Sequence, residues 1–144
     1  MEKISCGSAS VVYEIGNDGL LRACWKGLVL QNNAGEISAR LLEVADAAGA
    51  AGVIGRMTDS VVGLPPVTSQ HYAYVPTDLR AIPVALLISP EQNWVYSEVA
   101  TEAALSGTMR RAFLSLEQGE VWAECQVRAQ RANQAWWSTR RSQP

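Results

Sequence analysis

The chain has 144 residues, of which 48% are hydrophobic and 18% are charged, and its formal net charge is -2. This composition is that of a globular domain rather than a disordered chain, and the small negative charge gives it no general attraction for nucleic acid. No apolar run approaches the roughly 18 residues that span a bilayer, and the first residues lack the pattern of a signal peptide. We therefore expect a cytoplasmic protein.

The first elements predicted along the chain are two strands joined by a tight turn. Residues 11–15 (VVYEI) and 20–25 (LLRACW) are rich in residue types that favour strands. Asn17-Asp18-Gly19 lies between them, and the glycine accepts the positive φ that a short hairpin turn needs. The pattern predicts an antiparallel hairpin.

A helix is expected next, over about residues 34–48. Asn32 or Asn33 is suited to cap its start, and Gly49 is suited to end it. The apolar residues that recur at helical spacing are Ile37, Leu41, Val44, Ala45 and Ala48.

Three further strands are expected, at about 52–57, 84–88 and 111–114. The run at 84–88 (VALLI) is apolar throughout. Such runs are typical of central strands that are covered on both faces. Because helices separate these strands, we expect most of the sheet to be parallel.

Two helices in the second half begin with the same signal. The segments 89–92 (SPEQ) and 115–118 (SLEQ) both place Ser and Gln at the spacing of a capping box. The first of these helices is expected to run to about residue 105. The apolar stripe predicted for the last helix is formed by Gln118, Val121, Trp122, Cys125, Ala129 and Ala132.

The predicted elements follow the order ββαβ(α)βαβα. Residues 59–82 contain Pro65-Pro66 and only an interrupted helical pattern, and are interpreted as a loop with one or two short helices. The fold class is α/β, with a mixed, mostly parallel sheet of about five strands in a single domain over residues 1–132. Residues 133–144 are expected to be a C-terminal tail.

This order resembles the STAS fold, named for sulfate transporters and anti-sigma factor antagonists, and in particular the bacterial STAS-like proteins related to the sporulation anti-anti-sigma factor. Two segments carry the resemblance: IPVALLISPEQNW (82–94) and MRRAFLSLEQGEVWAE (109–124), the latter similar to the closing strand and final helix of that family. The resemblance covers about residues 10–126. It implies a small regulatory or ligand-sensing module.

The resemblance also points to the residues after the third predicted strand. In family members that switch partners, a kinase phosphorylates a Ser or Thr there, typically within Asp-Ser-Ser-Gly or Asp-Ser-Thr-Gly at a helix start. Here the matching residues are Asp59 and Ser60, followed by Val61 in place of the second hydroxyl. Asp59 and Ser60 are therefore a candidate switch or partner surface, and the alternative is that they only satisfy backbone groups at the strand end.

The segment 59–82 is also the basis of two rival hypotheses. A small apolar or anionic ligand would be held by a cleft that His71, Tyr72 and Tyr74 help to form. The least favoured hypothesis is a hydrolase-type enzyme that uses His71 with Asp59 or Asp78.

No metal or cofactor is expected. His71 is the single histidine, and the three cysteines, Cys6, Cys24 and Cys125, are widely spaced with no CxxC pair. Cys24 shares a strand face with Arg22, but no base or second cysteine lies beside it in the sequence. We expect a buried, unreactive thiol.

Trp136 and Trp137 stand between the arginines of the C-terminal tail. If the last helix continues to residue 137, Trp136 extends its apolar stripe, and Trp136 and Trp137 are a candidate oligomer contact. A surface membrane anchor ranks second, and nucleic-acid binding ranks third because the rest of the chain is acidic.

Together these features predict a non-enzymatic, STAS-like regulatory or protein-interaction module. A protein partner is expected to bind the loop at 59–76, which includes His71, Tyr72 and Tyr74, and the adjoining helix. A second copy of the chain is also an expected partner, which would make a homodimer. A small-molecule ligand is the alternative; neither nucleic acid nor a membrane is expected to bind.

Overall fold

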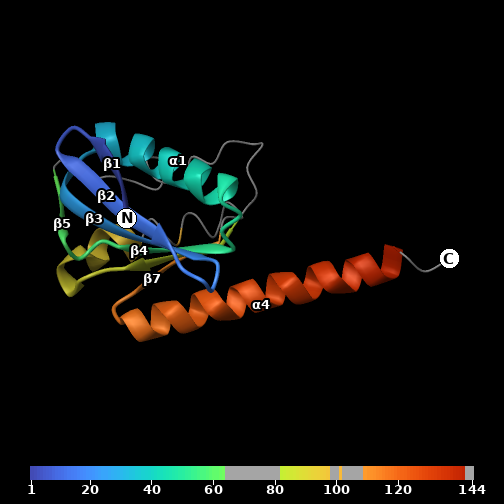
Figure 1. Cartoon of the computed structure of the whole chain (residues 1–144). Helices are drawn as coiled ribbons and strands as arrows, with labels where there is room; N and C mark the ends of the chain where they lie inside the picture. The colour runs from blue at the N-terminus through green and yellow to red at the C-terminus, as the bar shows by residue number, and fades with distance from the viewer. Residues whose placement is uncertain (64–81, 98–100, 102–108, 142–144) are drawn as a thin grey trace.

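The computed structural model describes residues 1–63, 82–97, 101 and 109–141, with side chains described as far as residue 136. Within these ranges the chain forms an α/β fold around one mixed sheet of seven strands. The sheet lies between α1 (Gln31–Ala47) on one face and α4 (Leu116–Arg141) on the other (Figure 1).

The N-terminal part is an antiparallel meander of β1 (Glu2–Cys6), β2 (Ala9–Ile15) and β3 (Leu20–Val29). The predicted hairpin turn is confirmed, with Gly19 at a φ of 81°. β1 was not expected, and β3 continues four residues beyond the predicted end. Gly27 lets it continue, because its φ of 86° brings its backbone close to the carbonyl oxygen of Ser8.

The rest of the sheet is parallel. β4 (Gly52–Arg56) pairs with β3, β6 (Val84–Leu87) with β4, and β7 (Arg110–Phe113) with β6. All four residues of β6 are buried, as its continuous apolar run predicts. A further short strand, β5 (Ser60–Val62), pairs with the second half of β3 and was not predicted.

The helices begin close to where the sequence places them. α1 starts three residues before its predicted start, where the Asn33 side chain accepts a hydrogen bond from the Leu30 amide at 2.9 Å. It ends before Gly49, which has a φ of 69°. The capping box at residues 89–92 is present, but its first turn is the 3-10 helix η1 (Pro90–Gln92), followed by helical residues 93–97.

Two apolar clusters hold the layers together. The larger one joins α1 to β1–β4 and includes Val11, Trp25 and Ile37. The smaller one joins α4 to the other face of the sheet and includes Ile54 and Ala85. α4 contacts β4, β6 and β7 and also packs on Leu20 at the start of β3, so the helix leaves uncovered the part of this face formed by β2 and the rest of β3.

The last helix differs from its prediction in length and in the face that it buries. Residues 133–141, assigned to a tail, continue the helix. The residues that α4 buries against the sheet are Gly119, Ala123 and Val127. Trp122 of the predicted stripe packs partly against this cluster, whereas Val121 and Cys125 are exposed. The small residues face the sheet because the helix comes close to it there.

Candidate functional site

Ser60 lies at the start of a strand rather than at a helix N-terminus. It opens β5 opposite Gly27 of β3, and it is only 6% exposed. Its hydroxyl donates a hydrogen bond to the carbonyl oxygen of Met57 at 2.6 Å, and its amide donates to the same oxygen at 3.0 Å. A kinase has no access to this hydroxyl unless the turn opens, so the geometry favours the structural interpretation of Ser60 over the switch.

Gln92 of η1 fixes this turn from the neighbouring element. Its side-chain oxygen accepts a hydrogen bond from the Ser89 amide at 3.0 Å, as expected of a capping box. Its side-chain nitrogen donates to the carbonyl oxygens of Met57 at 2.7 Å and Ser60 at 3.0 Å. The sequence identifies the cap but gives no signal for the second pair of bonds, which tie β6 and η1 to the turn before β5.

Large apolar side chains are exposed at the carboxyl end of the parallel strands. Val61 of β5 is 65% exposed and lies opposite Leu28 of β3, while Trp94 after β6 is 58% exposed. β5 and the start of α4 lie at the same end of the sheet (Figure 1). The carboxyl-end surface, as we call it, consists of Leu28, Val61, Trp94, Leu114 and Leu116.

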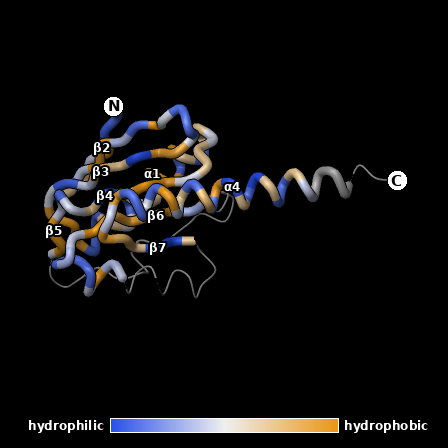
Figure 2. Tube along the Cα trace, turned by 90° about the horizontal axis from the view of Figure 1, so that it is seen from below, coloured by the Kyte–Doolittle hydropathy of each residue, from blue (hydrophilic) through white to orange (hydrophobic). Residues whose placement is uncertain are grey.

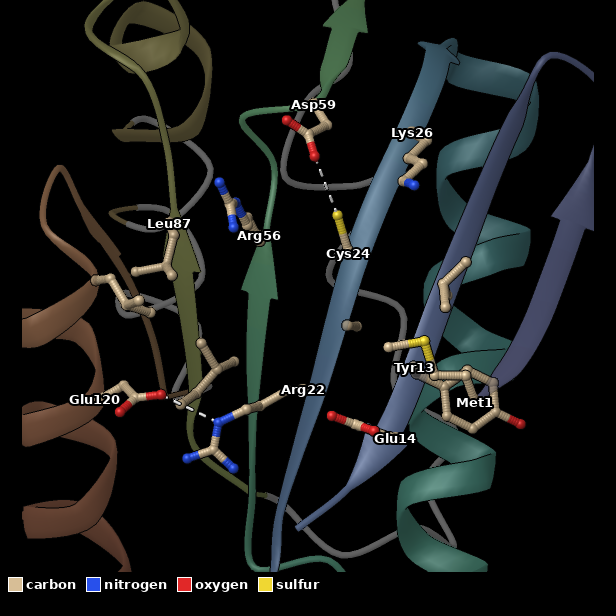
Figure 3. Close-up of a pocket in the computed structure, with 14 residues that line it drawn as sticks. Met1, Tyr13, Glu14, Arg22, Cys24, Lys26, Arg56, Asp59, Leu87 and Glu120 are labelled. Atoms are coloured by element: carbon tan, nitrogen blue, oxygen red, sulfur yellow. Dashed lines mark hydrogen bonds and ion pairs between the residues drawn. The ribbon is translucent and has the colours of Figure 1, made fainter.

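A pocket of about 410 Å³ lies on the sheet face that α4 leaves uncovered (Figure 3). Its apolar lining includes Val12, Ile54 and Leu87, and α4 closes one side. Its charged and polar lining consists of Glu14, Arg22, Cys24, Lys26, Arg56, Asp59 and Glu120. We call this the open-face pocket.

Cys24 stands in the middle of the pocket, between Lys26 and Arg56 (Figure 3). The thiol that was predicted to be buried is half-buried. Desolvation raises the pKa of this thiol, as does its hydrogen bond to Asp59 Oδ2 at 3.5 Å. The thiol form is therefore favoured at neutral pH, which agrees with the expected low reactivity.

The cations of the pocket fall into two kinds. Arg22 is held by Asp18 at 2.8 Å and by Glu120 at 3.1 Å, and the bond from Arg22 lowers the pKa of the Asp18 carboxyl. Lys26 and Arg56 form no ion pair with a carboxylate among the described residues, although Arg56 Nε donates to the Thr58 hydroxyl at 3.0 Å. These two side chains are therefore available to an anion.

The remaining candidate residues are not brought into these sites. His71, Tyr72 and Tyr74 lie outside the described residues, as does the side chain of Trp137. Trp136 lies on the distal part of α4. Within the described ranges, no three side chains of metal-binding type lie together, and none of the described helices has the length and apolarity needed to cross a bilayer.

The chain matches no protein-family model, no curated protein and no solved structure. The resemblance to STAS-like proteins therefore stays a prediction, supported by element order and hydrophobic pattern alone.

Proposed function

We propose that the chain is a non-enzymatic, STAS-like regulatory or protein-interaction module whose protein partner binds the carboxyl-end surface. The observation that carries this proposal is the exposure of five large apolar side chains at one end of the sheet. Large apolar side chains that gather at one end of a molecule and stay exposed to water are typical of protein interfaces.

Two properties of this surface support a protein partner. Trp94 belongs to the residue types that contribute most to binding energy at interfaces. Val61 stands on a strand that Gln92 holds in place, so the surface needs little ordering when a partner binds. The carboxyl ends of parallel strands are also where open α/β sheets usually bind their ligands.

Site-specific photo-crosslinking in cells tests this proposal. A photoreactive amino acid at Leu28 or Val61 is expected to give the same discrete protein adduct, because the two residues are cross-strand neighbours. Ile15 is the matched control: its exposure of 41% is close to the 40% of Leu28, but it stands at the opposite end of the sheet. No adduct at Leu28 and Val61, or the same adduct at Ile15, would reject the proposal.

A second candidate function is the binding of a small anion that carries an apolar group. The open-face pocket favours it, because Lys26 and Arg56 flank an apolar lining and the volume lies in the range of about 300–1,000 Å³ typical of ligand sites. The described residues of the 59–82 segment contribute Asp59 to this pocket.

Titration calorimetry with octanoate and octyl phosphate tests the second candidate. We expect Lys26→Gln and Arg56→Gln each to weaken binding by about tenfold, the effect of losing one charge-assisted contact of about 1.4 kcal/mol. Lys3→Gln, on the same sheet but outside the pocket lining, should have no effect. Equal binding of octanol, or no loss in the two variants, contradicts an anion site.

A further inference from the structure

The distal part of α4 extends beyond the body of the protein. The helix has 26 residues, which at 1.5 Å per residue is about 39 Å. Among the residues whose side chains are described, the last buried one is Val127. Gln130 and Arg131 still reach the body, near Met109 and Gly19, and residues 132–136 are all exposed. Figures 1 and 2 show this part projecting away from the sheet in two perpendicular views. We call residues 128–141 the arm.

A projecting helix of this length is marginally stable unless one of its faces packs against another surface. Isolated helices shorter than about 12–15 residues are marginal in water, and the arm is of that length. Helices in proteins owe most of their stability to packing of an apolar face. The arm should therefore carry a face that packs against something, and α4 has one.

This second apolar stripe lies opposite the face that α4 buries against the sheet. Ala123 and Val127 point to the sheet. At 100° per residue, the stripe is centred about 180° away from them. It runs from Val121, which is 55% exposed, to Trp136, which is 51% exposed. Its members are Val121, Cys125, Ala129, Ala132 and Trp136.

The charges of α4 are separated along its length. Its first half contains Glu117, Glu120 and Glu124 and no basic residue, whereas the arm contains four arginines and no acidic residue. A parallel pair of such helices would place like charges side by side. An antiparallel pair places each arm beside the acidic half of the other helix, and it does so twice because the contact is two-fold symmetric.

We propose that α4 of one copy pairs antiparallel with α4 of a second copy along this stripe. Val121 of each copy then lies beside Trp136 of the other, which puts the two-fold axis near residues 128 and 129. The small side chains of Cys125, Ala129 and Ala132 let the helices approach to the usual 8–10 Å. The bodies lie on opposite outer sides of the helix pair, so the carboxyl-end surface is not used and this contact is independent of the proposed function.

Disulfide trapping tests the orientation of the pair. In a Cys125→Ser background, Ala129→Cys is expected to form an intermolecular disulfide on mild oxidation, because the two copies of residue 129 lie beside the axis. Gln134→Cys is the matched control: it is exposed, but on the side of the helix that faces away from the stripe. Crosslinking of Gln134→Cys, or none of Ala129→Cys, would overturn the proposal.

Charge reversal tests the partner. An acidic variant carries Arg131→Glu and Arg140→Glu, and a basic variant carries Glu117→Arg and Glu124→Arg. Sedimentation equilibrium at low salt is expected to show a dimer for the wild-type chain. Each variant alone should have a dimer dissociation constant at least tenfold higher. An equimolar mixture of the two variants should restore the dimer. Circular dichroism confirms that each variant is folded. A monomeric wild-type chain overturns the proposal, also if its arm binds vesicles of anionic phospholipid instead. A mixture of the two variants that does not associate overturns it as well.

Discussion

Replacing Gln92 tests how the turn that carries the carboxyl-end surface is held. Gln92→Leu removes three hydrogen bonds made by a buried amide, to Ser89, Met57 and Ser60. Each bond contributes about 1 kcal/mol net, and the Ser89 amide loses its side-chain acceptor. We expect the free energy of unfolding to fall by about 3 kcal/mol, which corresponds to a decrease in Tm of about 10 °C for a chain of this size.

The assay is urea unfolding followed by circular dichroism, with Gln134→Leu as an exposed control that should stay within about 0.5 kcal/mol of the wild type.

Gln92→Glu adds a pH dependence. It keeps the acceptor for Ser89 but turns a carboxylate oxygen toward the carbonyls of Met57 and Ser60. Their repulsion raises the pKa of the new carboxyl in the folded state.

Because that pKa is raised, the destabilisation by Gln92→Glu should be smallest below about pH 4, where the carboxyl is protonated in both states, and should grow toward neutral pH. A loss below about 1 kcal/mol in Gln92→Leu, or a pH-independent effect in Gln92→Glu, would refute the role given to this side chain.

Two further predictions follow from the sheet. Gly27→Ala should lower the free energy of unfolding in urea by about 2–4 kcal/mol, because the added Cβ meets the Ser8 carbonyl in a positive-φ conformation. Gly7→Ala also has positive φ but open space around it, and should lose only about 1–2 kcal/mol. Equal losses in the two variants would contradict the close approach of Gly27 to Ser8. In a variant whose single cysteine is Cys24, Asp59→Asn removes a hydrogen bond and a charge that raise the thiol pKa. The pH midpoint of Cys24 alkylation should therefore move to lower pH. An unchanged midpoint would show that burial alone sets the thiol pKa.

Local patterns in the sequence were sufficient for most of the described elements. The hairpin at Gly19, the stop of α1 at Gly49 and the buried strand β6 depend on residues next to one another in the chain, and all three are confirmed. Of the two strands that were missed, β1 pairs with its neighbour β2, whereas β5 depends on distant partners. β5 has three residues, and its pairing with β3 is decided by Gly27 and by Gln92, far away in the sequence.

The face of α4 was missed for a different physical reason. A hydropathy pattern ranks Val121 and Trp122 above Gly119 and Ala123, but close packing selects for size. A Cβ at Gly119 would come within 2.6 Å of Leu87 on β6. Gly119 and Ala123 therefore face the sheet, and Trp122 packs at the edge of this contact against Phe113. The stripe from Val121 to Trp136 is left for contacts outside the body. The open-face pocket was missed because it depends on strand register, which brings Cys24 beside Arg56.

The order of strands in the sheet has a consequence for synthesis. Along β1, β2, β3, β4, β6 and β7, each strand pairs with the one before it, so the growing sheet gains one edge strand after another as the chain leaves the ribosome. α4 comes last and covers the cluster around Leu20 and Ile54. Until it does, that apolar face is exposed on the nascent chain. Chains released before residue 116 would keep it exposed, which makes premature termination the step at which this protein is most prone to aggregate.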